Sequence, residues 1–141
     1  MIEKIKVMLD EGAFMPERAH SADAGLDLFT PHKIEIWPDD SGVTVNTGVH
    51  ILIPEGYVGM LKSKSGLNVH KSILNEGVID AGYTGSIVVK LYNHGSEAVL
   101  FEKGAKISQL VILPIITPEM ELVDSFEETE RGANGFGSTG A

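Results

Sequence analysis

Apolar residues alternate with polar or small ones along residues 43–53, and this two-residue period limits what the chain can fold into. The apolar or β-branched positions are all odd: Val43, Val45, Thr47, Val49, Ile51 and Ile53. Successive side chains of a strand point to opposite faces of a sheet, so the pattern predicts one half-buried strand. The same alternation occurs near the start of the chain, at Ile5, Val7 and Leu9.

Two further segments have strand character, and glycine and proline separate all of these segments. Residues 86–92 (SIVVKLY) and 107–113 (ISQLVIL) are rich in β-branched residues and too short for typical helices. Turn residues recur between the segments, among them Pro31, Pro38, Gly42, Pro54, Gly56, Gly77, Gly82, Gly85, Gly95, Gly104 and Pro114. Many short strands with regular turn signals predict an all-β fold, a jelly-roll-like barrel or sandwich.

One short helix is expected after the stretch Ser63-Lys64-Ser65-Gly66, through residues 67–71. A helix that begins after serine and glycine can hold an anion, and the plainer interpretation is that the serine caps the helix. We see no internal repeat and no interdomain linker. The sequence therefore predicts a single β domain over residues 1–126. An acidic run at 127–130 then starts a mobile C-terminal arm over residues 127–141.

Length and composition exclude several classes of protein. The 141 residues are typical of one domain with one core. The chain has no cysteine, which excludes disulfides, zinc–thiolate sites and cysteine nucleophiles. We see no signal peptide and no apolar run long enough to span a membrane, so we expect a cytoplasmic protein, or one of the host cytoplasm if a phage encodes it.

The charge is acidic, which bears on the ligands that the protein can take. Eleven lysines and arginines against 20 aspartates and glutamates give a net charge of −9. Such a chain is a poor general binder of nucleic acid. It can still bind a small polyanion where a few cations converge or where a metal ion accompanies the ligand. The histidines at 20, 32, 50, 70 and 94 lack metal-ligand spacing and are interpreted as surface or packing residues.

The glycine-rich end of the chain, RGANGFGSTG at 131–140, has two interpretations. Glycine loses much backbone freedom on ordering, so the stretch can be a frayed terminus. It can instead be a flap that orders around an anion, as glycine-rich phosphate loops do. In that case Arg131 would supply charge and Phe136 a flat apolar face.

Five stretches, read in order, resemble the five motifs of the homotrimeric deoxyuridine triphosphatases (dUTPases). They are AGLDL at 24–28, KSGL at 64–67, GVIDAGYTG at 77–85, GAKISQL at 104–110 and the final RGANGFGSTG. The resemblance covers the chain from about residue 22 to its end. It implies a dUTPase-like β-clip of jelly-roll type and a homotrimer with active sites shared between subunits, in which the arm of one chain closes over a neighbour's site. It also implies Mg²⁺-dependent hydrolysis of dUTP to dUMP and pyrophosphate.

The resemblance assigns the residues of a nucleoside site. Asp80 would be the catalytic carboxylate that activates the attacking water and meets the sugar 3′-OH, whereas its own sequence context is that of a turn aspartate. Tyr83 would lie against the deoxyribose and exclude a 2′-OH. Uracil would be read by a hairpin from about Asn75 to Val88, with contacts expected from Asn75, Gly77, Val78, Ile79 and Val88. Cytosine would leave buried groups of that hairpin unpaired.

The resemblance also assigns the triphosphate contacts. They are expected from Lys64, Ser65, Gly66, Gln109, Arg131, Gly137 and Ser138, with Phe136 stacked on uracil. Mg²⁺ would arrive on the triphosphate and have no direct protein ligand. Asp27 and Lys106 would support these contacts without touching the phosphates directly. The family usually has arginine at positions 64 and 106, and lysine lacks the bidentate fork of arginine, so this departure affects the rate more than the reaction.

Two alternatives stay open at this level, one within the same fold and one from a different functional class. One is a dCTP deaminase-like relative, for which Glu76 is a nominal base. The other is a dUTP-dependent regulatory protein of a phage, which would act on a protein partner that the sequence does not name.

Overall fold

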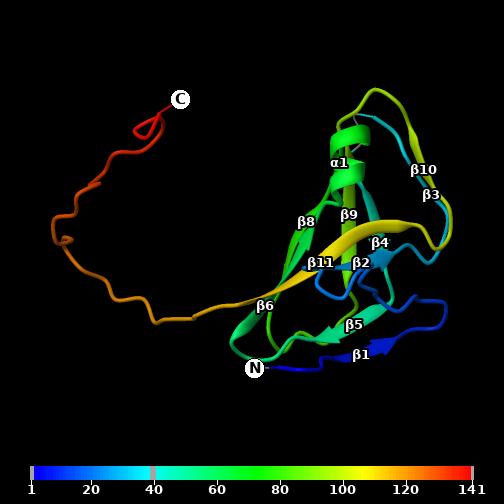
Figure 1. Ribbon diagram of the computed structural model, residues 1–141, viewed down its shortest axis with the longest axis horizontal. Helices are drawn as coiled ribbons and strands as arrows, with labels where there is room; N and C mark the ends of the chain where they lie inside the picture. The colour runs from blue at the N-terminus through cyan, green and yellow to red at the C-terminus, as the bar shows by residue number, and fades with distance from the viewer. Residues whose placement is uncertain (1, 39–40, 141) are drawn as a thin grey trace.

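The computed structural model describes residues 2–38 and 41–140 (Figure 1). Within those residues one helix, α1, spans Ser65–Lys71. The strands are β1 (Lys6–Leu9), β2 (Gly25–Phe29), β3 (Ile34–Ile36), β4 (Val43–Asn46), β5 (Val49–Leu52), β6 (Tyr57–Lys62), β7 (Ile73–Leu74), β8 (Glu76–Ile79), β9 (Val88–Asn93), β10 (Val99–Phe101) and β11 (Lys106–Pro114).

The strands pair antiparallel in four groups. The largest sheet has the order β2-β11-β6-β8, and a second sheet has the order β4-β9-β7. Two-stranded ladders join β1 to β5 and β3 to β10. The apolar faces of these groups enclose one core, which includes Leu28, Ile36, Val45, Val49, Ile53, Ile73, Ile87, Val89, Leu91, Ile107 and Leu110. The predicted all-β sandwich with one short helix is confirmed.

The single strand predicted over residues 43–53 is wrong in one respect. The predicted face is correct, because Val45, Thr47, Val49 and Ile51 are all buried. The strand is nevertheless broken between β4 and β5, which belong to different sheets. The break lies at Gly48, whose φ of +69° is a left-handed conformation that glycine adopts without strain. Alternation continues through the break because both halves face the same core.

The other sequence-predicted elements are close to those observed. Of the early alternating residues, Ile5 and Val7 pack against the core, whereas Leu9 is exposed. Helix α1 begins two residues earlier than predicted. Its N-cap is Lys64, which makes no side-chain capping bond, so the serine cap considered from the sequence is wrong.

The hairpin predicted from about Asn75 to Val88 is also wrong as a paired unit. Strand β8 pairs with β6, and β9 pairs with β4 and β7. No strand ladder joins β8 to β9 anywhere in the described residues. The two strands are therefore neighbours along the chain whose facing edges belong to different sheets.

The chain leaves the folded body after β11. Residues 115–140 carry no helix or strand and extend away from it (Figure 1). Several large apolar side chains of this extension are exposed, namely Ile116, Met120, Leu122, Val123, Phe126 and Phe136. Among the described residues there is no helix with the length and apolar character that crossing a bilayer would need.

Candidate active site

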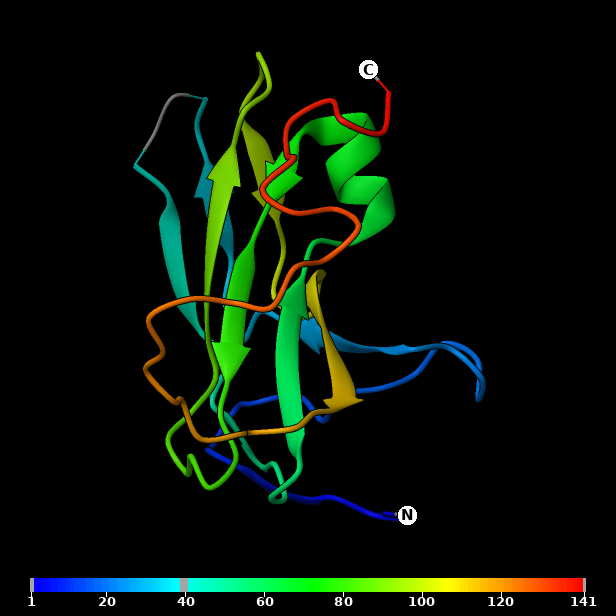
Figure 2. The ribbon, with the colours of Figure 1, turned by 90° about the vertical axis from the view of Figure 1, so that its left-hand side faces the viewer.

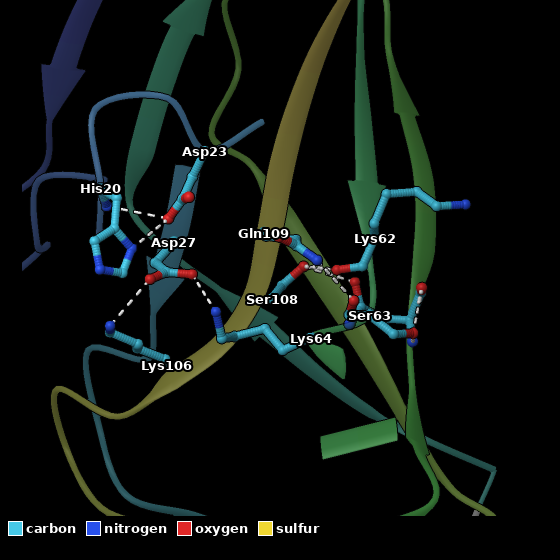
Figure 3. A network of polar contacts seen from close by, with 10 residues as sticks. His20, Asp23, Asp27, Lys62, Ser63, Lys64, Lys106, Ser108 and Gln109 are labelled. Atoms are coloured by element: carbon cyan, nitrogen blue, oxygen red, sulfur yellow. Dashed lines mark hydrogen bonds and ion pairs between the residues drawn. The ribbon is translucent and has the colours of Figure 1, made fainter. Parts of the chain in front are cut away.

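Asp27 is the buried centre of an ionic cluster built from three of the motif stretches. Its side chain, on β2, is only 6% exposed. Lys64, which precedes α1, donates to Oδ1, and Lys106, at the start of β11, lies 3.0 Å from Oδ2 (Figure 3). Pairing of β2 with β11 places Asp27 opposite Gln109 and so brings residues distant in sequence together.

Two opposing effects act on the Asp27 carboxyl. Burial raises its pKa, because removal from water disfavours the charged form. Hydrogen bonds and charge from Lys64 and then Lys106 act in the other direction, and together they hold the pKa of Asp27 below its ordinary value of 3.8. The carboxylate is therefore ionised at neutral pH and keeps both ammonium groups at one edge of the sheet.

A second polar chain runs beside this cluster, along β11 and the end of β6 (Figure 3). Gln109 donates through Nε2 to the Ser63 carbonyl at 2.9 Å. Gly25 leaves the space for this amide, because a Cβ built there would lie 2.0 Å from Gln109 Oε1. Ser108 donates to Asn75 Oδ1 at 2.6 Å.

Asn75 is the buried residue of this polar chain with an unused donor. Its backbone N–H donates to Ser63 Oγ at 3.0 Å, and its exposed fraction is 2%. Its side-chain Nδ2 has no hydrogen-bond partner among the described residues. A buried donor left unpaired costs about 1–3 kcal/mol, so this position favours a ligand or water acceptor.

A cavity of about 230 Å³ lies where β8 and β9 diverge. Its lining residues are Val78, Ile79, Asp80, Tyr83, Ser86 and Val88. Tyr83 is partly exposed and donates through its hydroxyl to the Ser86 carbonyl at 3.0 Å. Gly85 must lack a side chain here, since a Cβ would lie 2.2 Å from the Tyr83 oxygen. The cavity is therefore walled by a carboxylate, an aromatic ring and two strand edges.

The ionic cluster and the cavity lie at different ends of the folded body. The β6–β8 register places Glu76 beside Lys62, near α1, and Ile79 beside Gly59. A strand rises about 3.3 Å per residue, so Asp80 lies about 13 Å beyond Glu76. Figure 2 agrees, with α1 at the upper end and the turn after β8 at the lower end. One chain alone does not bring Asp80 to the start of α1.

The structure thus sorts the residues predicted from sequence into separate groups. Ser65 and Gly66 are exposed on the first turn of α1, beside the ionic cluster. The cavity brings together Val78, Ile79, Asp80, Tyr83 and Val88. Gly77 instead packs against Leu61, because a Cβ built on Gly77 would lie 2.9 Å from Leu61 Cδ1. Asn75 lies in the polar chain instead of the cavity.

The arm residues form a third group, away from the other two. Arg131 donates through Nε to the Asn134 carbonyl at 2.9 Å, and Phe136 is fully exposed with a φ of +23°. Gly137 and Ser138 belong to short turns of the same exposed segment.

Three serines of the site were not singled out from the sequence. Ser63 and Ser108 hold Asn75, and Ser86 lines the cavity. Each lies in or beside a motif stretch, which was the only available signal, because serine is common in turns and strands without any such role.

Comparison with known proteins identifies the family. A family model described as dUTPase matches residues 11–140. This chain belongs to the dUTPase family. It is 43% identical to the deoxyuridine 5′-triphosphate nucleotidohydrolase of Gloeothece citriformis over 97% of both chains. It is 40% identical to that of Mus musculus, over 95% of this chain and 83% of the mouse protein.

Solved dUTPase structures share the fold. The dUTPase of Staphylococcus bacteriophage 80alpha with dUPNHPP superposes with a TM-score of 0.93 at 35% identity, covering 99% of this chain and 100% of the other. A mutant dUTPase of the S. aureus phage phi11, described with a structural Mg(II) ion, has a TM-score of 0.81 at 33% identity over 89% and 99%. The β-clip jelly-roll expected from the motifs is confirmed.

The family uses Mg²⁺, and a structural Mg(II) ion is described for the phi11 enzyme. No group of three or more histidine, aspartate or glutamate side chains is placed to hold a metal within residues 2–38 and 41–140. The buried carboxylate of Asp27 is already neutralised by two lysines. Triphosphate oxygens are ligands of the kind that Mg²⁺ prefers.

Proposed function

We propose that this chain is a dUTP diphosphatase, which hydrolyses dUTP to dUMP and pyrophosphate by water attack on the α-phosphorus. The reaction removes dUTP before uracil can enter DNA and supplies dUMP for thymidylate synthesis. Family membership supports the substrate and reaction class. The observation that carries the proposal is the cavity walled by Asp80 and Tyr83 between β8 and β9, which form no ladder with each other in the described chain.

The divergence of β8 and β9 supports uracil recognition by the backbone. The outer edge of β8 has no strand partner in the described chain, so N–H and C=O groups of residues 77–79 are available to a base. Val88 contributes from the facing edge of β9. A base with the opposite donor and acceptor pattern, such as cytosine, would leave these groups unpaired, which is a strong basis for rejection. The Tyr83 ring would lie against the deoxyribose and leave no room for a 2′-OH.

Asp80 is the residue that we propose for proton transfer. Its carboxylate accepts a proton from water as the water oxygen forms a bond to the α-phosphorus, and the bond from that phosphorus to the bridging oxygen breaks. Pyrophosphate leaves with the electron pair of that bond. A positioned general base of this kind contributes about 10²–10⁴-fold to the rate.

The cations and N–H donors of the α1 end would bind the triphosphate. We assign contacts there to Lys64, Ser65, Gly66 and Gln109, with Mg²⁺ neutralising the phosphate charge as part of the substrate. Asp27 keeps Lys64 in place through the buried ion pair, and Lys106 shares that role. The unpaired Asn75 Nδ2 is a donor that ligand or water can satisfy.

We further propose a homotrimer in which each active site uses more than one chain. Asp80 and the triphosphate contacts must lie within a few ångströms of one phosphate, yet one chain holds them at opposite ends of its body. Residues 127–141, of which Ala141 lies outside the described residues, would form an arm over a neighbour's site. Arg131 would then contact the γ-phosphate, Gly137 and Ser138 would donate to phosphate oxygens, and Phe136 would stack on uracil.

The two alternatives from the sequence fare differently. A deaminase is not favoured, because its nominal base, Glu76, is exposed and paired with Lys62 at 2.8 Å, outside the cavity. A regulatory role has one finding behind it, namely that the 80alpha enzyme is described as controlling transfer of virulence genes. That candidate requires a protein partner. It would be tested by measuring dUTP hydrolysis and partner pull-down on one sample.

We place the activity in the cytoplasm, or the host cytoplasm for a phage chain.

The deciding experiment is pyrophosphate release with Mg²⁺ across the common dNTPs and UTP. We expect turnover of dUTP alone. Hydrolysis in ¹⁸O-labelled water should place the label in dUMP. Label in pyrophosphate would contradict attack on the α-phosphorus, and release of ammonia from dCTP would instead support a deaminase.

A further inference from the structure

His50, on β5, connects two segments that the catalytic site needs to keep in register. Its ring Nδ1 lies 2.7 Å from the backbone oxygen of Thr84, in the turn after β8. Its Nε2 lies 3.0 Å from Asp10 Oδ1, at the end of β1. The side chain is 22% exposed, so these two contacts are made by a ring held largely within the fold.

The turn that His50 contacts carries Asp80 and Tyr83. Its backbone is tied to the β5 segment on either side, by Gly82 N–H to the Ile53 oxygen at 3.1 Å and by Ile87 N–H to the Val49 oxygen at 2.7 Å. His50 reaches the turn midway between those two bonds. Thr84 immediately follows Tyr83 in sequence, so this contact lies one residue from the ring that walls the cavity.

The backbone of Asp10 is fixed by two hydrogen bonds. Its backbone N–H donates to the Gly48 oxygen at 2.8 Å, and its oxygen accepts from Ala13 N–H at 3.1 Å. The catalytic turn is thereby joined through one imidazole to the side chain of Asp10, which directly follows the β1–β5 ladder.

Both partners of the ring are hydrogen-bond acceptors. A backbone carbonyl and an ionised carboxylate have no proton to donate, and a neutral imidazole has a single N–H. Only the imidazolium donates to both at once. The Thr84 carbonyl first, and then Asp10, raise the pKa of His50 above its ordinary 6.5, against a smaller lowering by burial.

We propose that His50 is a positioning residue of this enzyme: its imidazolium clamps the turn carrying Asp80 and Tyr83 to Asp10, and its deprotonation releases the turn. The neutral ring turns a lone pair toward one of the two acceptors, so one bond becomes a repulsion. The proposal concerns the regulation of the site described above and rests on the proposed function only where catalysis is measured.

Several charged groups lie on the elements that pack against His50. The charged groups on the packed elements are Lys6, Asp10 and Glu11 on the β1 side and Asp80 at the start of the turn. Of these, Asp10 is the one in ionic contact with the ring within the described chain. Removing the Asp10 charge should therefore shift the titration of His50 to lower pH.

The test measures two quantities on the full-length protein against pH. NMR follows the His50 ring and the backbone amides of Thr84 and Gly85, and steady-state kinetics follows kcat/KM for MgdUTP. We expect the titration of the His50 ring, the chemical-shift change of the two amides and the fall of kcat/KM at alkaline pH to share one midpoint pH. Asp10→Asn should move all three midpoints down together. His50→Gln should remove that step and lower kcat/KM about tenfold or more at the pH where the wild type is clamped, since small misplacements of catalytic groups are costly.

His32→Gln is the matched control, because Thr30 contacts the backbone of His32 rather than its ring. It should keep the wild-type profile. The proposal is overturned if the amides of Thr84 and Gly85 do not follow the His50 titration, or if His50→Gln keeps the alkaline step. If His50→Gln does not fold, Asp10→Asn still tests the proposal. A His50 ring titration that shifts in Asp10→Asn while the pH profile of kcat/KM does not shift would also overturn the proposal. A wild type that binds no dUTP would contradict the proposed function, while the NMR result would still test the clamp.

Discussion

Asp27 shows how a single buried carboxylate organises residues that were assigned separate roles from the sequence. Lys64 was expected at phosphate and Lys106 behind the site, and both converge on the same side chain. The sequence could not predict this convergence, because it depends on the β2–β11 register, which no local pattern specifies. The motif stretches did identify the three residues, since each lies in a stretch that resembles a family motif.

Replacing Asp27 with asparagine should change the acid stability of the protein. The folded pKa of Asp27 is lowered, so its stabilising contribution is present above the ordinary pKa of 3.8 and is lost as pH falls through the folded value. Asp27→Asn should destabilise by about 1–3 kcal/mol at neutral pH, because two lysines lose their counter-charge. The difference from wild type should shrink toward acid pH. Urea unfolding at fixed protein concentration between pH 7 and pH 3 measures it.

The matched control for that measurement is Asp23→Asn. Asp23 pairs with His20 on the surface, where both side chains are well exposed, so it should cost at most about 1 kcal/mol. Equal losses for the two variants would show that the Asp27 cluster has no special stabilising role.

Asp80→Asn should separate binding from catalysis. An amide keeps the size of the side chain but cannot accept the proton of water, so we expect turnover to fall by about 10²–10⁴-fold. Affinity for MgdUTP should stay within a few-fold of wild type. Calorimetric titration and pyrophosphate release on the same preparation check both. Turnover within a few-fold of wild type would mean that Asp80 is only the turn residue that its sequence context suggests.

At the scale of elements, periodicity predicted which faces are buried but not where strands end. The alternation over 43–53 is continuous because β4 and β5 contribute to the same core. The break at Thr47-Gly48 is set by tertiary contacts: Thr47 Oγ1 donates to the Ile87 oxygen at 2.7 Å, and Asp10 N–H donates to Gly48. Likewise, the glycines near 77–85 indicated a turn but not that its two strands join different sheets.

Gly48→Ala tests whether this break is required. The left-handed conformation costs a residue with a side chain about 1–2 kcal/mol, and the new Cβ would also lie 3.0 Å from Ala13 Cβ. Gly56→Ala is the control, because Gly56 has a similar φ of +85° and no neighbour within 4 Å. We expect chemical denaturation to show a larger loss at 48 than at 56. Equal losses would show that the contact with Ala13 relaxes without cost.

At the scale of the whole molecule, the distribution of site residues makes a prediction about assembly. One chain holds the ionic cluster, the Asp80 cavity and the arm apart, and the long exposed extension after Pro114 has its apolar residues uncovered. The family motifs assigned the proposed site residues, whereas their separation became visible only in three dimensions. The proposed trimer completes each site from several copies and should appear as a single trimeric species in light scattering.

Two individually inactive variants test the sharing of sites. A chain that ends at Glu130 should fold and associate normally, because residues 131–140 are exposed and bury nothing in their own body. Its turnover should fall by orders of magnitude. Ordering about ten residues costs near 1–2 kcal/mol each, so stacking by Phe136, the Arg131 charge and several N–H bonds to phosphate must act together on the full triphosphate. The second variant, Asp80→Asn, keeps its arm but lacks the base.

Co-expression of the two variants then distinguishes shared sites from self-contained ones. If the arm and Asp80 of one site come from different chains, random trimers with equal amounts of each variant should regain about a quarter of the wild-type sites. The regained sites pair an arm from the Asp80→Asn chain with an Asp80 from the truncated chain. If each chain closes over its own cavity, no mixture can regain activity, since every chain lacks one component. Near-full turnover of the truncated chain alone would instead show that the glycine-rich stretch is a frayed end.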